Sequence, residues 1–183
     1  PGARRTLRVQ PVLIYQIFKP RPQTSWRPWG GLFTEKEVAE ERTRIGRELE
    51  AIARAAGYPV EFLPLREVRS ADEGKAVAAG DYDALLMYPA SGSVRLLESV
   101  STPDRPAVIF VRHRSGPVYE WYEIVHPRFL RKTDDDWGQP GADAMDVVVD
   151  ETADVAWRLR ALGGLKHTQG RRVLCLGGAS GWG

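Results

Sequence analysis

The chain has 183 residues, enough for one well-buried domain and short for two. Hydrophobic residues make up 43% of it and charged residues 27%, an ordinary globular composition that argues against intrinsic disorder. The net charge of +2, from 26 basic and 24 acidic side chains, is too balanced for a nucleic-acid-binding surface. No apolar run approaches the ~20 residues that span a bilayer.

The amino-terminal part of the chain is locally basic, because no acidic residue precedes Glu35. The basic residues of this part are Arg4, Arg5, Arg8, Lys19, Arg21 and Arg27. A solvated terminus and loop would give this pattern, and so would an anion-binding site. Both interpretations stay open.

A single cysteine, Cys175, excludes an intrachain disulfide and a cysteine-based zinc site. It lies in an apolar run, which predicts an inert, buried thiol. The chain begins at Pro1, so removal of a leader and export from the cell stay open. The sequence predicts a soluble protein and leaves its localisation undetermined.

Short apolar runs predict the strands of a sheet. The predicted strands cover residues 12–18, 60–65, 82–88, 107–111 and 173–176, with a shorter one at 147–149. The runs at 82–88 and 107–111 do not alternate polar with apolar residues, which is typical of strands covered on both faces.

Two capping boxes mark the starts of predicted helices. The first lies at residues 34–37, and its helix carries an apolar stripe up to Gly57, which ends it. The second, at residues 70–73, opens a short helix that ends near Gly80. We expect further helical segments at 118–131, with a break at Pro127, and at 152–162, closed by Gly163 and Gly164, and an exposed loop at 134–144.

The alternation of strands and helices predicts an α/β fold of the flavodoxin or Rossmann-like type. We expect a parallel sheet with strand order 2-1-3-4-5 in a domain of residues 1–165. Residues 166–183 add the last strand and a glycine-rich turn, from which a second domain could begin. No helix follows this turn, so we expect the fold to be incomplete at its carboxyl end, and residues 177–183 to need a partner polypeptide to become ordered.

Ligands of such sheets bind outside the carboxyl ends of the strands, near the point where the strand order reverses. We expect four loops to meet there, at residues 19–33, 89–93, 112–117 and 177–183. The candidate ligand-binding residues on these loops are Arg21, Trp26, Arg27, Trp29, Ser91, Arg112, His113 and Trp182. Indole rings suit the apolar faces of sugars, and guanidinium groups donate to hydroxyls, carboxylates and phosphates. The pattern therefore favours a small sugar or an anionic sugar as the ligand.

Several of these residues have a second interpretation. Trp26 and Trp29 would equally serve as packing anchors of the long first loop, and Trp182 as a residue that further sequence buries. His113 is either a general acid–base group or a loop histidine that satisfies backbone groups. No catalytic residue is assigned.

The sequence contains no complete metal-binding or nucleotide-binding motif. Glu120, Glu123 and His126 have the spacing of half a di-iron carboxylate site, but the sequence holds no second copy. An amphipathic helix with its apolar residues facing inward explains this segment, so we assign no metal ligands. The chain also lacks a Walker A loop, a Gly-x-Ser-x-Gly elbow and the acidic pair of a receiver domain, and its glycine-rich end lacks the spacing of a dinucleotide motif.

Three segments carry a resemblance to a known family. They are Arg112-His-Arg-Ser-Gly-Pro-Val-Tyr-Glu-Trp-Tyr-Glu-Ile-Val-His-Pro-Arg-Phe-Leu-Arg131, Gly138-Gln-Pro-Gly141 and Gly177-Gly-Ala-Ser-Gly-Trp-Gly183. These segments resemble the amino-terminal region of bacterial proteins described as sugar isomerase-like, which are distant relatives of the L-fucose and L-arabinose isomerases. The resemblance implies stacked Rossmann-like domains and metal-dependent aldose–ketose isomerisation, typically with Mn²⁺ held by carboxylate and histidine ligands of later domains.

The resemblance also implies a homo-oligomer, in which an amino-terminal domain helps to close the active site of a neighbouring subunit. We therefore expect this chain to be the substrate-side or assembly domain of a sugar isomerase-like protein and to be inactive on its own. Its partners would be the remainder of the parent polypeptide or a neighbouring subunit. One alternative is a non-catalytic carbohydrate- or anion-binding domain, and another is a purely structural oligomerisation domain.

Overall fold

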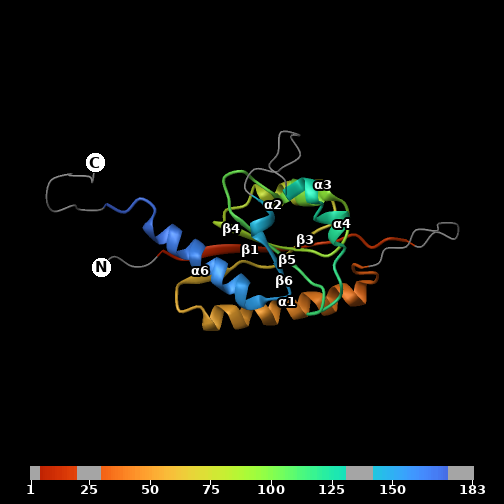
Figure 1. Ribbon diagram of the computed structural model, residues 1–183, viewed down its shortest axis with the longest axis horizontal. Coiled ribbons are helices and arrows are strands. Elements are labelled where there is room, and N and C mark those ends of the chain that lie inside the picture. Colours follow the sequence, from red (N-terminus) through yellow and green to blue (C-terminus); the bar gives the residue numbers. More distant parts are fainter. Residues whose placement is uncertain (1–4, 20–29, 131–141, 173–183) are drawn as a thin grey trace.

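A parallel β-sheet with helices on both faces makes up the described part of the molecule (Figure 1). The computed structural model describes residues 5–19, 30–130 and 142–172. Its strands are β1 (Leu7–Ile14), β2 (Val60–Phe62), β3 (Arg66–Val68), β4 (Ala84–Pro89), β5 (Ala107–Val111) and β6 (Val147–Val149). Its helices are α1 (Glu35–Ala55), α2 (Ala71–Ala78), α3 (Val94–Val100), α4 (Trp121–Ile124), α5 (Pro127–Leu130) and α6 (Thr152–Thr168), with a short 3-10 turn at Ala144–Asp146. Among these described helices, none has the length and apolar character needed to cross a membrane.

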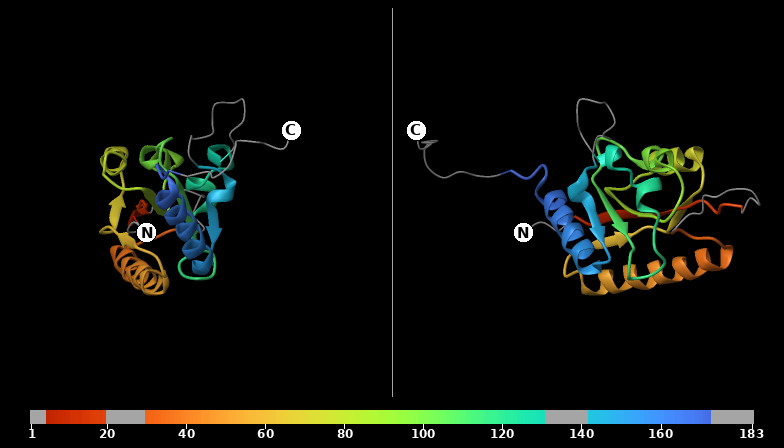
Figure 2. Two further views of the ribbon diagram at one scale, coloured as in Figure 1. Left: turned by 90° about the vertical axis from the view of Figure 1, so that its left-hand side faces the viewer. Right: turned by 45° about the vertical axis from the view of Figure 1, so that its right-hand side comes forward.

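The sheet has the order β2-β1-β4-β5-β6, and β3 pairs with β1 on the same side as β2. Every described strand pair is parallel. Helices α1 and α6 lie on one face of the sheet, and α2 and α3 lie together on the other (Figure 2). This arrangement confirms the predicted α/β class with a flavodoxin or Rossmann-like sheet.

The strand order differs slightly from the predicted 2-1-3-4-5. The edge predicted as a single strand at residues 60–65 consists of two short strands, β2 and β3. The far end of the described sheet is β6. The predicted strand at 173–176 and most of the predicted loop at 134–144 lie outside the described residues.

Pro11 explains why the edge of the sheet beside β1 is split into two strands. The carbonyl of Val9 and the N–H of Tyr15 bond to residues on the side of β1 where β2 and β3 lie. Every second residue of a strand directs its backbone groups to the same side, so those of Pro11 also face β2 and β3. Pro11 has no N–H to donate, and it falls in the gap between β2 and β3. The Gln10 side chain bridges this gap, because its amide donates to the carbonyl oxygens of Pro11 and Pro64, both at 2.9 Å.

The boundaries of the first strand were predicted incorrectly. The strand covers Leu7–Ile14 rather than 12–18, and Pro11 lies in its middle, at the gap between β2 and β3. Residues 15–19 leave the sheet and form part of its carboxyl edge. The runs predicted at 82–88 and 107–111 correspond to β4 and β5, both buried along their whole length.

Both predicted capping boxes are present. The Thr34 hydroxyl accepts a hydrogen bond from the Glu37 N–H at 3.2 Å, and the Glu37 carboxylate accepts one from the Thr34 N–H at 2.9 Å. Ser70 and Glu73 form the same pair of bonds at the start of α2. Each box supplies acceptors for backbone donors that the first helical turn leaves unpaired, which fixes where α1 and α2 begin.

Two helix predictions need correction. Helix α3 was not predicted. Helix α6 continues through Gly163 and Gly164 to Thr168, so these glycines do not end it. A Cβ added to Gly163 would lie 2.9 Å from the Tyr58 ring, so this glycine permits close packing instead. The predicted break at Pro127 is confirmed, since Pro127 is the first residue of α5.

Candidate functional site

The loops that follow β1, β4 and β5 meet at the carboxyl edge of the sheet, as expected for parallel strands. The Ser91 hydroxyl, which follows β4, donates to the Gln16 carbonyl at 3.0 Å and accepts from the Gln16 N–H at 3.1 Å. The Gly31 N–H donates to the carbonyl of Val118 at 2.6 Å, which joins the end of the first loop to the loop after β5. Hydrogen bonds therefore join the segments that follow β1, β4 and β5 at this edge.

Ser91, a predicted ligand residue, is buried at this junction with 1% of its surface exposed. Its hydroxyl is engaged on both sides by the Gln16 backbone. Gly31 packs directly on it, since a Cβ on Gly31 would lie 2.8 Å from the Ser91 Cβ. The structure therefore places Ser91 as a connector between two loops, and direct contact with a ligand stays a prediction.

A buried carboxylate lies beneath the same junction. Glu120 is fully buried, and its carboxylate accepts a hydrogen bond from the Gly92 N–H at 3.4 Å. Gly92 and Gly31 both have positive φ angles, of 117° and 107°, which suit glycine. The carbonyl of Ala90 accepts the Glu120 N–H at 2.9 Å, so this residue is fixed to the end of β4 by its backbone as well.

Beside this junction, an open hollow of about 630 Å³ lies at the carboxyl ends of β1 and β3. The residues that line it are Tyr15, Gln16, Ile17, Phe18, Lys19, Glu35 and Arg69. Gln16 connects the hollow with the loop junction, because its backbone binds Ser91 and its side-chain amide donates to the Arg69 carbonyl at 3.4 Å.

The lining of the hollow combines apolar surface with charge. Phe18, Lys19 and Arg69 are exposed, while Tyr15 is buried and forms part of the floor. The Tyr15 hydroxyl donates to Glu67 at 2.6 Å, and burial, followed by the Glu67 carboxylate, raises the pKa of Tyr15 to about 12. This phenol is therefore protonated near neutral pH and cannot act as a base there.

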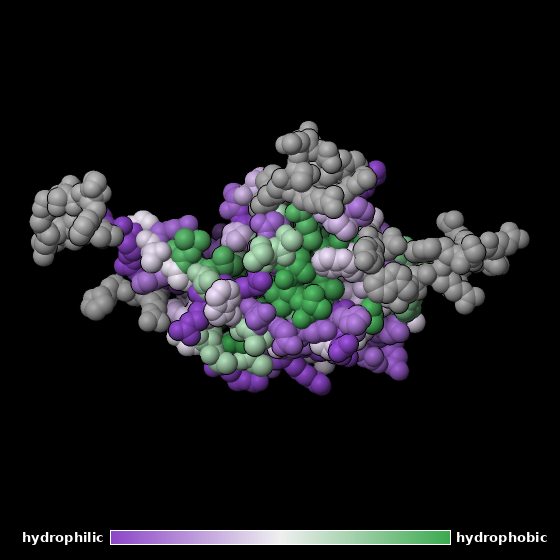
Figure 3. Space-filling model, in the orientation of Figure 1, coloured by the Kyte–Doolittle hydropathy of each residue, from purple (hydrophilic) through white to green (hydrophobic). Residues whose placement is uncertain are grey.

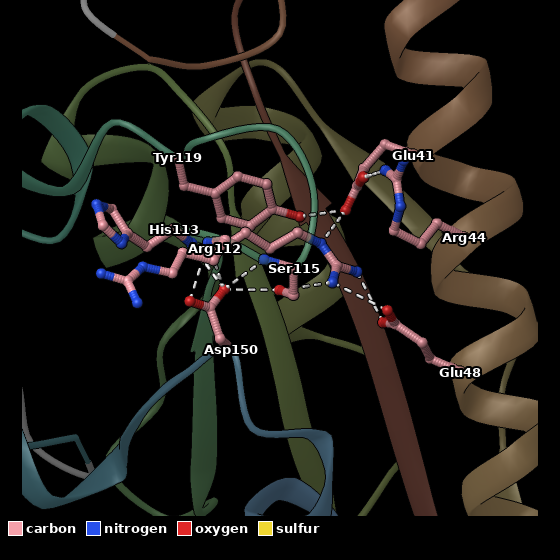
Figure 4. Close-up of polar contacts among 9 residues, drawn as sticks. Glu41, Arg44, Glu48, Arg112, His113, Ser115, Tyr119 and Asp150 are labelled. Carbon is pink, nitrogen blue, oxygen red and sulfur yellow. Dashed lines mark hydrogen bonds and ion pairs between the residues drawn. The ribbon is translucent and has the colours of Figure 1, made fainter.

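A buried ion-pair network lies on the α1 face of the sheet, next to this edge (Figure 4). Arg112, which follows β5, has no exposed surface. Its Nε donates to the Glu41 carboxylate at 2.5 Å, and its two terminal nitrogens donate to the Glu48 carboxylate at 2.9 and 2.7 Å. Glu41 also accepts a hydrogen bond from the Tyr119 hydroxyl at 2.6 Å and forms an ion pair with Arg44.

Burial and the neighbouring charges in this network shift the pKa values of Arg112 and Tyr119. Burial alone would lower the pKa of Arg112, but the Glu48 and Glu41 carboxylates and Tyr119 raise it, and the net shift is upward. Burial and the Glu41 charge likewise raise the pKa of Tyr119 well above its usual value. Arg112 was predicted to contact a ligand, but its guanidinium lies under α1. A sugar-binding role for Arg112 would require these hydrogen bonds to break.

The backbone of the loop after β5 also binds the side-chain carboxylate of Asp150. The Asp150 carboxylate accepts hydrogen bonds from the N–H groups of His113, Arg114 and Ser115 at 2.8, 2.9 and 3.0 Å, and from the Ser115 hydroxyl at 2.7 Å (Figure 4). Burial opposes ionisation of this carboxyl group, but the hydrogen bonds hold the pKa of Asp150 far below its usual range. Consecutive N–H groups of this kind form an anion-binding nest, which Asp150 fills here.

His113 therefore takes part in the nest through its backbone, while its side chain is exposed. An acid–base or ligand role for its imidazole stays a prediction. The remaining predicted ligand residues, Arg21, Trp26, Arg27, Trp29 and Trp182, lie outside the described residues.

The described residues do not fit the manganese site that the family resemblance implies for a parent protein. Among them, no three His, Cys, Asp or Glu side chains gather in a way that could hold a metal ion. At α4, Ile124 and Val125 are buried and Trp121 packs against the core, in keeping with the amphipathic interpretation of this segment. No step of a reaction is therefore derived through a metal on this chain.

Several important residues of this edge were missed from the sequence. Glu41 carried a recognisable signal, because it lies within the apolar stripe of α1 between Val38 and Ile45 and had to find a buried cation. Asp150 follows a strand directly, but its left-handed backbone (φ 61°) and its nest become visible only in three dimensions. Gln16 and Arg69 carried no signal that separates them from ordinary loop residues.

Comparisons of the chain with protein-family models, with curated proteins and with solved structures gave no match. The resemblance to sugar isomerase-like proteins therefore stays an expectation.

Proposed function

We propose that this chain is the substrate-side domain of a sugar isomerase-like protein and binds a small anionic sugar in the hollow at the carboxyl ends of β1 and β3. The metal-dependent aldose–ketose isomerisation that the resemblance implies would be carried out by later domains. The observation that carries the proposal is the hollow itself, which lies at the sheet edge where such folds bind ligands.

The lining explains why a sugar with an anionic group is the favoured ligand. Phe18 and Ile17 offer apolar surface to the C–H face of a sugar ring. Gln16 can donate to and accept from hydroxyl groups. Lys19 and Arg69 outnumber Glu35, the carboxylate in the lining, so a phosphate or carboxylate group is attracted to this hollow.

A second candidate function uses the same hollow without an isomerase partner. Tyr15 remains protonated near neutral pH and donates its hydroxyl hydrogen to Glu67, so it cannot remove a proton from a sugar carbon. A hollow in which Tyr15 does not serve as a base also suits a non-catalytic carbohydrate- or anion-binding domain. Isomerase activity of the parent protein with Mn²⁺ would favour the first candidate, and its absence the second.

The binding proposal is tested by titrating the chain with glucose 6-phosphate and with glucose in a calorimeter. We expect the phosphate ester to bind more tightly, and Arg69→Met to weaken its binding about tenfold, which corresponds to about 1.4 kcal/mol. Arg54→Met is the matched control, because Arg54 is an exposed arginine in the last turn of α1, at the opposite end of the helix from Glu35.

If neither sugar binds, or if the two variants weaken binding equally, the hollow is not the site. If glucose and its phosphate bind equally, the anionic preference is wrong.

A further inference from the structure

Helix α6 presents an exposed apolar face. Trp157 is 69% exposed and Leu165 is 53% exposed, although both are large hydrophobic residues. Ala153 and Ala161 lie on the same face, since residues four apart in a helix are neighbours. Gly164 is exposed as well, and the space next to its Cα is open.

The opposite side of the same helix is also apolar. Val155 and Leu159 are buried in the core, with 2% and 0% of their surface exposed. Helix α6 thus carries apolar residues on two sides, and one of them packs on the core. Among the described residues, nothing covers the side that carries Trp157.

The apolar surface continues beyond the helix. Met145 is 75% exposed and lies next to α6, because Arg158 donates a hydrogen bond to its carbonyl. Val149, at the end of β6, is 49% exposed. Figure 3 shows hydrophobic surface over β6 and over the carboxyl-terminal part of α6 on one side of the molecule.

We propose that a second copy of this chain covers this face, with the two α6 helices packed antiparallel across a twofold axis. In such an interface the same surface meets itself. Ala161 and Gly164 have no large side chains, so the two helices can approach closely near them. Trp157 of each copy can then pack across the small residues of the other.

The distribution of charge along α6 favours a second copy over an unrelated protein. Its amino-terminal end carries the exposed acidic residues Glu151 and Asp154, and its other half and the residues beyond it carry the exposed basic residues Arg160, Arg171 and Arg172. An antiparallel copy brings the acidic end of one helix toward the basic end of the other. The two helix dipoles also oppose each other in this arrangement. One helix therefore supplies both halves of a complementary surface.

The size of the interface determines the affinity that we expect for the dimer. A helix of this length extends about 25 Å, and even with Met145 the contact lies near the lower end of specific interfaces, about 600 Å² for each partner. A dissociation constant in the micromolar range is therefore expected, and the dimer forms reversibly as the concentration rises.

Sedimentation velocity over about 1 to 100 μM protein tests this proposal. We expect the dissociation constant of the dimer to rise at least tenfold in Ala161→Arg, because a long charged side chain then stands at the centre of the interface. Ala51→Arg is the matched control, since Ala51 is an exposed alanine on α1, and this variant should dimerise like the original chain. Far-UV circular dichroism establishes that both variants fold.

A chain that stays monomeric throughout this range overturns the proposal. A dimer that Ala161→Arg leaves unchanged, or that Ala51→Arg weakens equally, shows that α6 is not the interface. Trp157→Ala gives a second measurement that introduces no charge: loss of dimer supports the α6 face, and an unchanged dissociation constant contradicts it.

Discussion

Arg112 is the largest fully buried side chain among the described residues. It connects the end of β5 to α1 through two carboxylates, Glu41 and Glu48, so the helix and the sheet are joined by charge as well as by apolar packing. The loop that begins at Arg112 also forms the nest around Asp150. One residue therefore fixes the helix, the strand end and the start of a loop at the carboxyl edge.

Removing this cation should destabilise the fold strongly. In Arg112→Met the fully buried Glu41 loses its fully buried cation and keeps only the partly exposed Arg44, and breaking a buried ion pair of this kind costs about 3–5 kcal/mol. Urea unfolding measures the change. Arg42→Met is the control, because Arg42 forms an exposed ion pair with Glu67 whose loss should cost about 0–1 kcal/mol. Equal losses in the two variants would contradict the role of the buried network.

The Asp150 nest should make stability depend on pH in the acid range. The pKa of Asp150 is depressed in the folded state, so its contribution is fully present above the unfolded pKa of about 4 and is lost as the pH falls toward the folded value. We expect Asp150→Asn to be less stable than the original chain at pH 7 and the difference to shrink by pH 3.

Urea unfolding at the two pH values checks this expectation, with Asp104→Asn as a control at an exposed turn. A difference between Asp150→Asn and the original chain that stays constant from pH 7 to pH 3 would show that ionisation of Asp150 does not stabilise the fold.

At the scale of elements, glycine in α6 illustrates how the same residue type serves two purposes. Gly163 faces Tyr58, and a Cβ there would lie 2.9 Å from the ring. Gly164 is next in sequence and has open space around it. Both were expected to end the helix, but α6 continues past them to Thr168.

This pair gives a prediction with an internal control. Gly163→Ala should destabilise the chain, because the Tyr58 ring has to move away from the new methyl group. Gly164→Ala should stabilise it by about 0.5–1 kcal/mol, since alanine is the better residue in a helix and meets nothing there. Thermal unfolding of the two variants at low protein concentration measures both effects. The same sign of change in both would contradict the packing role of Gly163.

Elements with strong local signals were predicted correctly, and those that depend on tertiary contacts were not. The capping boxes at Thr34 and Ser70 located α1 and α2 because a helix start is a local hydrogen-bonding problem. The bounds of β1 were predicted incorrectly, since a proline is tolerated inside it only because of the gap between β2 and β3. Helix α3 was missed because its sequence has no capping box, and its amino terminus has no side-chain cap.

At the scale of the whole molecule, the order of strands and helices was enough to predict a parallel α/β sheet, because right-handed crossovers leave few arrangements open. The meeting of the segments after β1, β4 and β5 at one edge followed from the same parallel arrangement. The hollow did not, since its lining residues come from the segment after β1, from the start of α1 and from the end of β3. Only the packing of these segments brings Arg69 next to Gln16.

The position of each strand in the sheet should also set how readily it opens. Strand β4 is paired on both sides and is buried along its whole length. Strand β6 has three residues and pairs with β5 alone among the described strands, and Val149 within it is 49% exposed. We therefore expect β4 amides to exchange with solvent only through global unfolding and β6 amides through local opening. Native-state hydrogen exchange in low denaturant measures both, and β6 amides that follow the same denaturant dependence as those of β4 would show that this edge opens only with the whole fold.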